Sequence, residues 1–464
     1  MTDRDPIVRT PRSALPGVIS PAVPDANASL LLALLYQLDQ TQWLSPQALA
    51  RHQGGQLRVL LQHAAATVPF YRERFAAAGI DPAAVGPETI ARLPAVQRAE
   101  LQAAGEALKS TALPKSHGKC HDIVTSGSTG RPVNLLGTEV TALFWRAFVM
   151  REHFWHRRDL SGKLAAIRWA RKGVAMAPEG ARRDDWGPAS GSVYPTGPAV
   201  LLNIASPLEA QLEWLLREQP DYLISFPSNL TALAGYCLQA GIAIPNLKQV
   251  LTLGEMVGEP VRRAVRQAWQ VPVVDSYSCE EAGYLATQCP DHEVYHVQSE
   301  NVLLEVVDDD GRPCAPGEIG RVLVTSLNNF ATPVIRYALG DYAEVGEPCA
   351  CGRGLPVIRR IVGRERNRLL LPDGTSVFPY FGYYEDYLAI TRAIKRYQLV
   401  QRAVGELECR LVALEPLTAE QEERIRQTML RHLGHPLRIS FTYHDELLPG
   451  PTGKFEEFVS EVQR

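Results

Sequence analysis

One stretch decides the fold, and it reads Thr125-Ser126-Gly127-Ser128-Thr129-Gly130-Arg131-Pro132-Val133. It follows His121-Asp122-Ile123-Val124, which we expect to form a short buried strand. Glycine lets the backbone bend with its N–H groups pointing inward, and the hydroxyls add donors around the same hollow. Such a loop is typical of a site for the terminal phosphates of a nucleotide. It is not the GxxxxGK[ST] loop of P-loop NTPases, because no Lys follows Gly130. A Ser/Gly surface turn is the alternative for these nine residues alone.

Length and composition limit the classes of protein to consider. A chain of 464 residues predicts two or more domains, and 45% apolar with 21% charged residues is ordinary for a globular protein. The net charge of −3 argues against a general nucleic-acid or membrane binder. Residues 1–28 are rich in Pro and Ala without the apolar core of a secretory signal, so we expect a flexible tail. The eight scattered cysteines make no disulfide framework, and we expect a cytoplasmic protein.

The middle of the chain alternates strand and helix patterns, which predicts an open α/β sheet. Ligands of such sheets bind beyond the carboxyl ends of the strands. Gly254-Glu255 and Ser276-Tyr277 follow two predicted strands, so they are candidates for binding the nucleotide base. The expected strands are 164–167, 222–226, 249–253 and 271–275, and the expected helices are 30–44, 55–78, 140–155, 208–217, 230–241 and 261–269.

From about residue 297 the pattern changes to short strands joined by turns, at 302–307, 320–325 and 333–337. This predicts a small antiparallel β subdomain over about 297–362. Roughly 100 residues of mixed α and β follow Gly363, including a helix at 418–433 and a strand at 438–443. We therefore expect a large domain over 29–362 and a smaller α+β domain over 363–464.

Two pairs of metal-binding residues stand far apart in the chain. Cys289-Pro290-Asp291-His292 offers a Cx2H pair, and Cys349-Ala350-Cys351-Gly352 offers a CxC pair. Structural zinc sites are usually built from two such pairs, so the sequence predicts zinc on Cys289, His292, Cys349 and Cys351. His296 is the alternative nitrogen ligand, and four unconnected residues are the alternative to any site.

Five motifs in order resemble those of the adenylate-forming acyl/aryl-CoA synthetase superfamily. The preamble Val68-Pro69-Phe70-Tyr71-Arg72 is similar to that of its phenylacetate–CoA ligase branch. The resemblance spans about residues 55–464. The motifs are the 125–133 loop, Tyr277-Ser278-Cys279-Glu280-Glu281, Arg336-Tyr337-Ala338-Leu339-Gly340-Asp341, Gly363-Arg364, and Gly450-Pro451-Thr452-Gly453-Lys454.

The resemblance implies a two-step ligase with a mobile C-terminal domain. A carboxylate attacks the α-phosphorus of ATP to give an acyl-adenylate and pyrophosphate, and after rotation about Gly363–Asn367 a thiol such as that of CoA takes the acyl group. By resemblance, Thr125, Ser126, Gly127, Ser128, Thr129 and Gly130 hold the β- and γ-phosphates, Glu281 binds Mg²⁺, Asp341 binds the ribose, Arg364 contacts the ribose and phosphate side, and Lys454 neutralises charge on the reacting groups.

Two positions depart from the family pattern. Glu280 stands where a Ser or Thr hydroxyl is usual, and Arg366-Asn367 occupy the hinge where an acidic residue or Lys is usual. An extra negative charge near phosphates is unfavourable unless a cation offsets it. Neither departure removes Asp341 or Lys454, although each leaves open a catalytically silent nucleotide-binding interaction protein.

The acid and its acceptor are less defined. We expect an acyl pocket near Trp145, Phe226 and Gly283, suited to an aromatic or other small carboxylic acid, although such aromatics also serve as plain core. The acceptor is CoA, with a carrier-protein thiol or an amine as alternatives. We expect no nucleic-acid or membrane partner, and dimerisation is common in the resembled branch.

Overall fold

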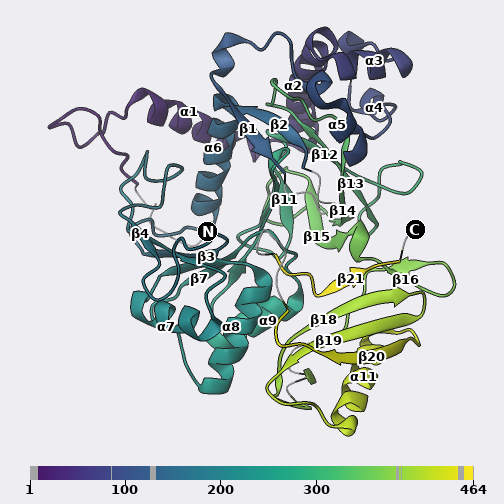
Figure 1. Ribbon diagram of the computed structural model, residues 1–464. Coiled ribbons are helices and arrows are strands. Elements are labelled where there is room, and N and C mark those ends of the chain that lie inside the picture. Colours follow the sequence, from purple (N-terminus) through teal and green to yellow (C-terminus); the bar gives the residue numbers. More distant parts are fainter. Residues whose placement is uncertain are drawn as a thin grey trace. The chain divides into compact units, whose positions relative to one another are not determined.

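The computed structural model describes residues 9–84, 86–125, 132–382, 386–387, 389–447 and 454–462 (Figure 1). The chain forms two compact units. The first contains Met1–Gly162, Arg183–Ala199 and Ser276–Ile361, and the second contains Lys163–Arg182, Val200–Asp275 and Val362–Arg464. Among the described residues, no helix has both the length and the apolar character needed to cross a membrane.

The first unit is built on a seven-stranded sheet in the order β12-β13-β14-β15-β11-β10-β9. The described pairings are antiparallel, as expected for the β subdomain. The predicted strand at 333–337 is wrong, because β14 begins at Tyr337: Pro333 has no N–H to donate, and Arg336 turns the backbone at φ +47°. The strands are β9 (Ser276–Cys279), β10 (Gly283–Gln288), β11 (Tyr295–Val297), β12 (Val302–Val307), β13 (Ile319–Ser326), β14 (Tyr337–Val345) and β15 (Val357–Arg364).

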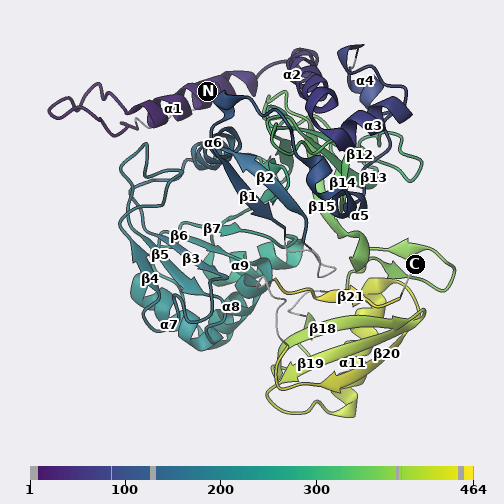
Figure 2. The same ribbon diagram turned by 45° about the horizontal axis from the view of Figure 1, so that its top comes forward.

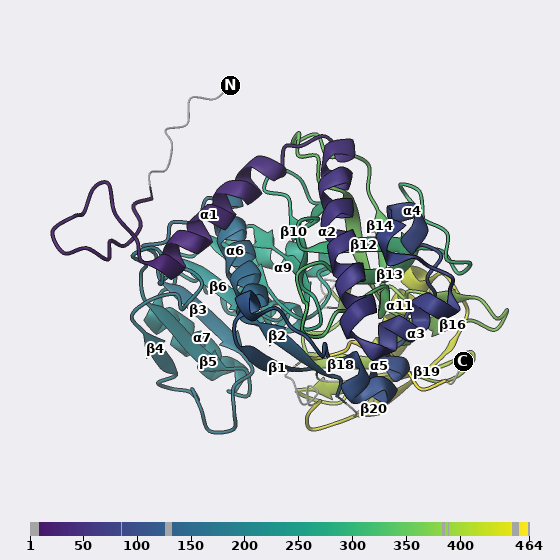
Figure 3. The same ribbon diagram turned by 90° about the horizontal axis from the view of Figure 1, so that it is seen from above.

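Helices of the N-terminal third cover this sheet. The single helix predicted over 55–78 is in fact two, because Pro69 cannot donate the N–H that would continue α2. α2 also begins earlier than the predicted residue 55, because Ser45 caps its start by accepting the N–H of Ala48. α1 packs against α6 (Figure 3). The helices are α1 (Ala26–Thr41), α2 (Pro46–Thr67), α3 (Pro69–Ala77), α4 (Pro87–Ile90), α5 (Arg98–Ala104) and α6 (Glu139–Trp155), with short 3₁₀ turns at Pro82–Ala84, Gly105–Leu108 and Lys115–His117.

The strand before the Ser/Thr/Gly loop is confirmed, but its predicted burial is wrong. Within the described part of the chain, β1 (Cys120–Val124) forms a two-stranded sheet with β2 (Asn134–Thr138), and Val124 is 60% exposed. A two-stranded ribbon leaves much of its surface open to solvent. β2 leads directly into α6 (Figure 2).

The second unit contains the predicted α/β sheet, in the order β4-β5-β3-β6-β7-β8. The described pairs β3–β6, β6–β7 and β7–β8 are parallel. In the hydrophobic core of this sheet, Leu223 and Val250 of the strands pack with Leu230 of α8 and Val265 of α9. The elements are β3 (Leu164–Arg168), β4 (Ala181–Arg183), β5 (Ala199–Asn203), β6 (Tyr222–Ser225), β7 (Gln249–Thr252), β8 (Val273–Val274), α7 (Leu208–Glu218), α8 (Pro227–Ala240) and α9 (Glu259–Trp269).

The C-terminal part of this unit is a four-stranded sheet in the order β20-β19-β18-β21, packed on α11. Thr418 caps α11 with a capping box to Gln421, and Gly434 ends the helix in the left-handed conformation. The elements are a 3₁₀ turn at Glu365–Asn367, β16 (Leu369–Leu370), β17 (Ser376–Val377), β18 (Ile394–Ala403), β19 (Glu406–Ala413), α11 (Ala419–Leu433), β20 (Arg438–Tyr443) and β21 (Phe458–Ser460).

Candidate functional site

Two predicted nucleotide-binding residues meet in the first unit. Tyr277 lies on β9 and Asp341 on β14, and the Tyr277 hydroxyl donates a 2.8 Å hydrogen bond to Oδ2 of Asp341. Both side chains are less than 10% exposed. A carboxylate has about four acceptor positions, so one hydrogen bond does not exhaust the acceptor capacity of a group such as Asp341. The pair is 64 residues apart in the sequence, and the fold brings it together.

Replacing Tyr277 by Phe tests this pair. We expect Tyr277→Phe to weaken ATP binding about fivefold, since a lost hydrogen bond to a buried acceptor costs about 1 kcal/mol. Asp341→Asn, which removes the charge and one acceptor, should weaken binding more. Equilibrium titration with ATP measures both, and native affinity in Tyr277→Phe would contradict the role given to the pair.

Glu281, the predicted magnesium ligand, follows β9 and is 8% exposed. Its Oε1 lies 3.5 Å from a guanidinium nitrogen of Arg98, which sits at the start of α5. Another nitrogen of Arg98 donates to Oγ1 of Thr125 at 2.8 Å. The predicted metal ligand and the first loop residue therefore share one cation. Ser126, Gly127, Ser128, Thr129 and Gly130 lie outside the described residues.

Ser276 was predicted to contact the base, but its hydroxyl is held elsewhere. It donates to Oε2 of Glu152 at 2.7 Å, and the hydroxyl of Tyr284 donates to the same atom at 3.2 Å. Burial alone would raise the pKa of Glu152, yet the charge of Arg158, two neighbouring histidines and the hydrogen bond from Ser276 together outweigh it, and the pKa falls to about 2. Glu152 is thus an anion that anchors β9 and β10 to α6.

Trp145 and Gly283, predicted for the acyl pocket, line a cavity of about 790 Å³ in the first unit. The rings of Trp145 and Tyr284 lie 4.9 Å apart at 59°. Gly283 has φ +76°, and a Cβ there would approach both Trp145 and Asn301 within 4 Å. Nδ2 of Asn301 donates to the carbonyls of residues 282 and 284 at 2.9 Å, which fixes the turn after Glu281.

Lys454 lies against the end of β7 in the second unit. Gly254 follows this strand with φ +72°, and a Cβ built on it would lie only 2.9 Å from Cε of Lys454. The same Cβ would be 3.2 Å from the ring of Phe226, so the predicted pocket residue Phe226 lies beside Gly254 as well. The absence of a side chain at Gly254 is what lets the lysine approach the backbone.

Glu255 fixes the segment that carries this lysine. Its Oε1 accepts the N–H of Phe455 at 2.7 Å, and its Oε2 accepts the N–H of Ser228 at 2.9 Å. Burial raises the pKa of Glu255, although these hydrogen bonds and the charge of Lys454 act against the rise. Glu255, predicted to bind the base, therefore accepts a hydrogen bond from Phe455, the residue directly after the predicted catalytic lysine.

Arg364 ends β15 at the predicted hinge, and the two unusual residues after it belong to the C-terminal sheet. Arg366 forms an ion pair with Glu456, and Nδ2 of Asn367 donates to the carbonyl of Phe458 at 2.6 Å. Residues 366–367 are therefore bonded to β21 and to the segment before it. Gly363, at φ +148°, is the preceding position with the backbone freedom of a pivot.

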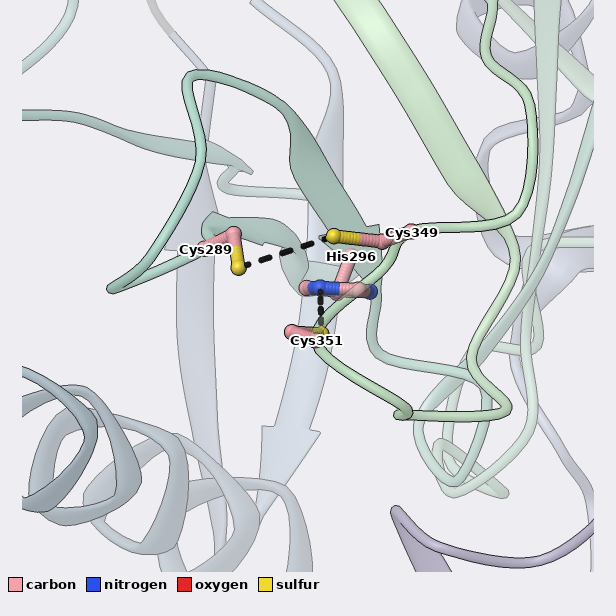
Figure 4. Close-up of side chains that lie close together, drawn as sticks. All are labelled: Cys289, His296, Cys349 and Cys351. Atoms are coloured by element: carbon pink, nitrogen blue, oxygen red, sulfur yellow. Dashed lines mark hydrogen bonds between the residues drawn. The ribbon is translucent and has the colours of Figure 1, made fainter. Parts of the chain in front are cut away.

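The predicted cysteines come together in the first unit, with His296 completing the cluster (Figure 4). Ligand atoms of Cys289, His296, Cys349 and Cys351 all lie within 4.8 Å of one another. The Sγ atoms of Cys289 and Cys349 are 3.8 Å apart, and Sγ of Cys351 is 3.3 Å from Nε2 of His296. The structure differs here from the predicted set, which had His292 in place of His296.

His292 nevertheless lies at the edge of the cluster, because its Nδ1 is 3.3 Å from Sγ of Cys349 and 3.8 Å from that of Cys289. Zn–S bonds of about 2.3 Å in a tetrahedron require sulfurs roughly 3.8 Å apart, which the Cys289–Cys349 distance fits. Thiolates with an imidazole are the donors of structural zinc sites. The residues present therefore fit a zinc ion, with two histidines available for one position.

Sequence reasoning missed several residues of the site. Arg98, Glu152 and Asn301 belong to no motif and act from a distance in sequence. Only Glu100, two residues after Arg98 in the first turn of α5, offered a signal, and it predicts a helix start rather than a site.

Comparison with curated proteins gives relatives over most of the chain, whereas no family model matches it. The phenylacetate-coenzyme A ligase of Thermus thermophilus is 26% identical over 422 residues, covering 87% of this chain and 90% of the relative. That of Pseudomonas putida is 27% identical over 381 residues, covering 80% and 82%.

Solved structures agree on the fold. A 2-hydroxyisobutyryl-CoA ligase in the postadenylation state superimposes with a TM-score of 0.70 at 19% identity, covering 91% of this chain and 92% of that one. An anthranilate CoA ligase gives a TM-score of 0.51 at 16% identity, covering 73% and 66%. The predicted α/β class, with its larger N-terminal and smaller C-terminal parts, is confirmed. The chain is therefore similar over most of its length to phenylacetate-coenzyme A ligases, and it shares the fold of solved CoA ligases.

Proposed function

We propose that this protein activates a small carboxylic acid with ATP, forming an acyl-adenylate, and transfers the acyl group to the thiol of CoA. The buried hydrogen bond between Tyr277 and Asp341 carries the proposal, because it presents a carboxylate as ribose-binding proteins require. The phenylacetate-coenzyme A ligases among the relatives support the choice of reaction.

In the first step a carboxylate oxygen of the acid attacks the α-phosphorus, and pyrophosphate leaves with the electrons of the broken P–O bond. Phosphoryl chemistry depends mainly on positioning and charge stabilisation. Asp341 holds the ribose, the loop from Thr125 to Gly130 holds the β- and γ-phosphates, and Lys454 offsets charge on the reacting groups. Arg364 contributes on the ribose and phosphate side. Mg²⁺ stabilises the charge of the phosphates, and Glu281 offers it the oxygen ligand that this hard cation prefers.

In the second step the CoA sulfur attacks the acyl carbonyl and AMP leaves with the former P–O–C oxygen. We assign a large domain to 29–362 and a mobile domain to 363–464, with rotation at Gly363 removing Lys454 before the thiol enters. Gly363→Ala should slow this step more than the first, since a Cβ at φ +148° is strained and would lie 3.0 Å from the ring of Phe378. Single-turnover assays of the two steps measure it, and equal slowing of both would contradict the pivot.

The acid fits the cavity lined by Trp145 and Tyr284, whose tilted rings offer faces to an aromatic group. We therefore propose an aryl or arylacetic acid. ATP–pyrophosphate exchange across a panel of acids tests this, and exchange with long fatty acids alone would contradict it.

A structural zinc ion belongs to the proposal, held by Cys289, Cys349, Cys351 and His296. Four protein ligands leave no open position, so the ion stabilises the ends of β10, β11 and β15 and takes no part in the chemistry. Elemental analysis of the purified protein should give about one zinc per chain.

AMP release with and without CoA tests the acceptor. Release that depends on CoA supports the proposal, whereas release that depends on an amine or a carrier protein would assign those acceptors instead. Tight ATP binding with no pyrophosphate exchange for any acid would indicate a catalytically silent protein. That outcome is the one that the extra charge of Glu280 would favour.

A further inference from the structure

Arg98 lies between Thr125, the first residue of the Ser/Thr/Gly loop, and Glu281, the predicted magnesium ligand. It is the first residue of α5, which packs beside β14 (Figure 2). Val96 fixes this placement, because its N–H donates to the carbonyl of Arg336 at 2.8 Å and its carbonyl accepts from Ala338 at 2.9 Å. The segment that leads into α5 is therefore hydrogen-bonded to β14, the strand that carries Asp341, and to the residue before it.

Among the described residues, the guanidinium of Arg98 contacts two predicted nucleotide-site residues, Thr125 and Glu281, and also Tyr337. It donates to Oγ1 of Thr125 at 2.8 Å, lies 3.5 Å from Oε1 of Glu281, and hydrogen-bonds the hydroxyl of Tyr337. Oγ1 of Thr125 also accepts the N–H of Val133 at 3.2 Å, so the arginine contacts the closed base of the loop.

The contact with Glu281 is weaker than a formed ion pair. At 3.5 Å it exceeds the 2.7–2.9 Å of a charge-assisted hydrogen bond. In addition, Nε of Arg98 is buried and has no hydrogen-bond partner among the described residues. A buried donor without a partner costs free energy, so this atom is available to an anion.

We propose that Arg98 is a nucleotide-binding cation, which pairs with Glu281 when the site holds no nucleotide and donates to the β- or γ-phosphate when ATP binds. This inference rests on the proposed function. When Arg98 donates to the phosphate, the carboxylate of Glu281 becomes available to the metal. Arg98, Glu281 and the phosphate each keep an opposite charge beside them. Arg98 also supplies the positive charge that offsets Glu280, which lines the neighbouring cavity.

Binding of ATP in the presence of EDTA tests Arg98 without the metal and without turnover. We expect Arg98→Gln to raise the Kd for ATP about tenfold, the effect of losing a charge-assisted hydrogen bond. Arg98→Lys, which keeps the charge, should recover part of the affinity. Conversely, Mn²⁺ binding without nucleotide should become tighter in Arg98→Gln, because Glu281 loses a competing cation.

Arg74→Gln is the matched control. Arg74 forms an ion pair with Glu100, which lies on α5 as Arg98 does, and Arg74 has no contact with Thr125 or Glu281 among the described residues. It should bind ATP as the wild type does. ATP affinity unchanged in Arg98→Gln, with a wild-type melting temperature, would overturn the inference. Should Arg98→Gln fail to fold, Arg98→Lys decides: a moderately weaker affinity for ATP in a folded protein supports the inference, and an affinity for ATP identical to that of the wild type overturns it, because a lysine cannot reproduce the contacts of the guanidinium. A wild-type protein that does not bind ATP would instead contradict the proposed function itself.

Discussion

Lys454→Ala should reduce acid-dependent ATP–pyrophosphate exchange about 100- to 1,000-fold, the range found when one preorganised charge-stabilising donor is removed. The rate of thioester formation from supplied acyl-adenylate should stay within about twofold of the wild type, because a group that acts only in the first transition state affects only that step. Rapid-quench measurements of both half-reactions check the two rates. Equal loss in both would show that Lys454 supports the fold rather than the first step.

Gly254 provides an independent test of the same geometry. A methyl group there would lie 2.9 Å from Cε of Lys454, so Gly254→Ala should displace the lysine and slow the first step although the lysine itself is intact. The backbone strain at φ +72° adds a cost to stability, which the melting temperature reports separately. Gly241→Ala is the matched control: this glycine has φ +65° and no atom within 4 Å of its would-be Cβ. It should lower stability similarly and leave the chemistry unchanged.

The elements that sequence predicted well share a local cause. α11 and the strands β3, β6 and β7 are set by neighbouring residues, so the spacing of apolar side chains was enough to predict them. Tyr277 was predicted from its position after a strand and Asp341 from the resemblance to a family motif, whereas the hydrogen bond between them was not predicted. These signals are local even where the resulting contact is not.

What sequence could not predict depends on tertiary contacts or on one unusual backbone position. Arg336 was read as part of a strand, yet it adopts φ +47° and its guanidinium forms a buried ion pair with Glu305 of β12. The exposure of β1 depends on how many strands flank it, which its own residues do not specify. Arg98 reaches Thr125 only because Val96 is paired with β14, a contact between residues about 240 positions apart.

Replacing the cysteines of the metal cluster should have the second-largest effect, and it should fall on stability. We expect Cys349→Ser to lose bound zinc and to lower the melting temperature by about 5 °C or more, since the free energy of binding a structural ion contributes to folding. The cluster holds β10, β11 and β15, which are neighbours in the sheet, and β10 begins two residues after Glu281. Cys120→Ser, at an exposed cysteine of β1, is the control and should change neither zinc content nor stability.

The two histidines decide which four ligands hold the ion. His296 is fully buried, and burial together with the charge of Arg353 lowers its pKa to about 4, so its imidazole is neutral. His292 contacts two of the sulfurs from the edge. His296→Ala should therefore lose zinc as Cys349→Ser does, while His292→Ala should retain about one ion per chain. If His292→Ala alone lost the metal, the set originally expected from the Cx2H spacing would be the correct one, and Nε2 of His296 would be only a neighbour of Cys351.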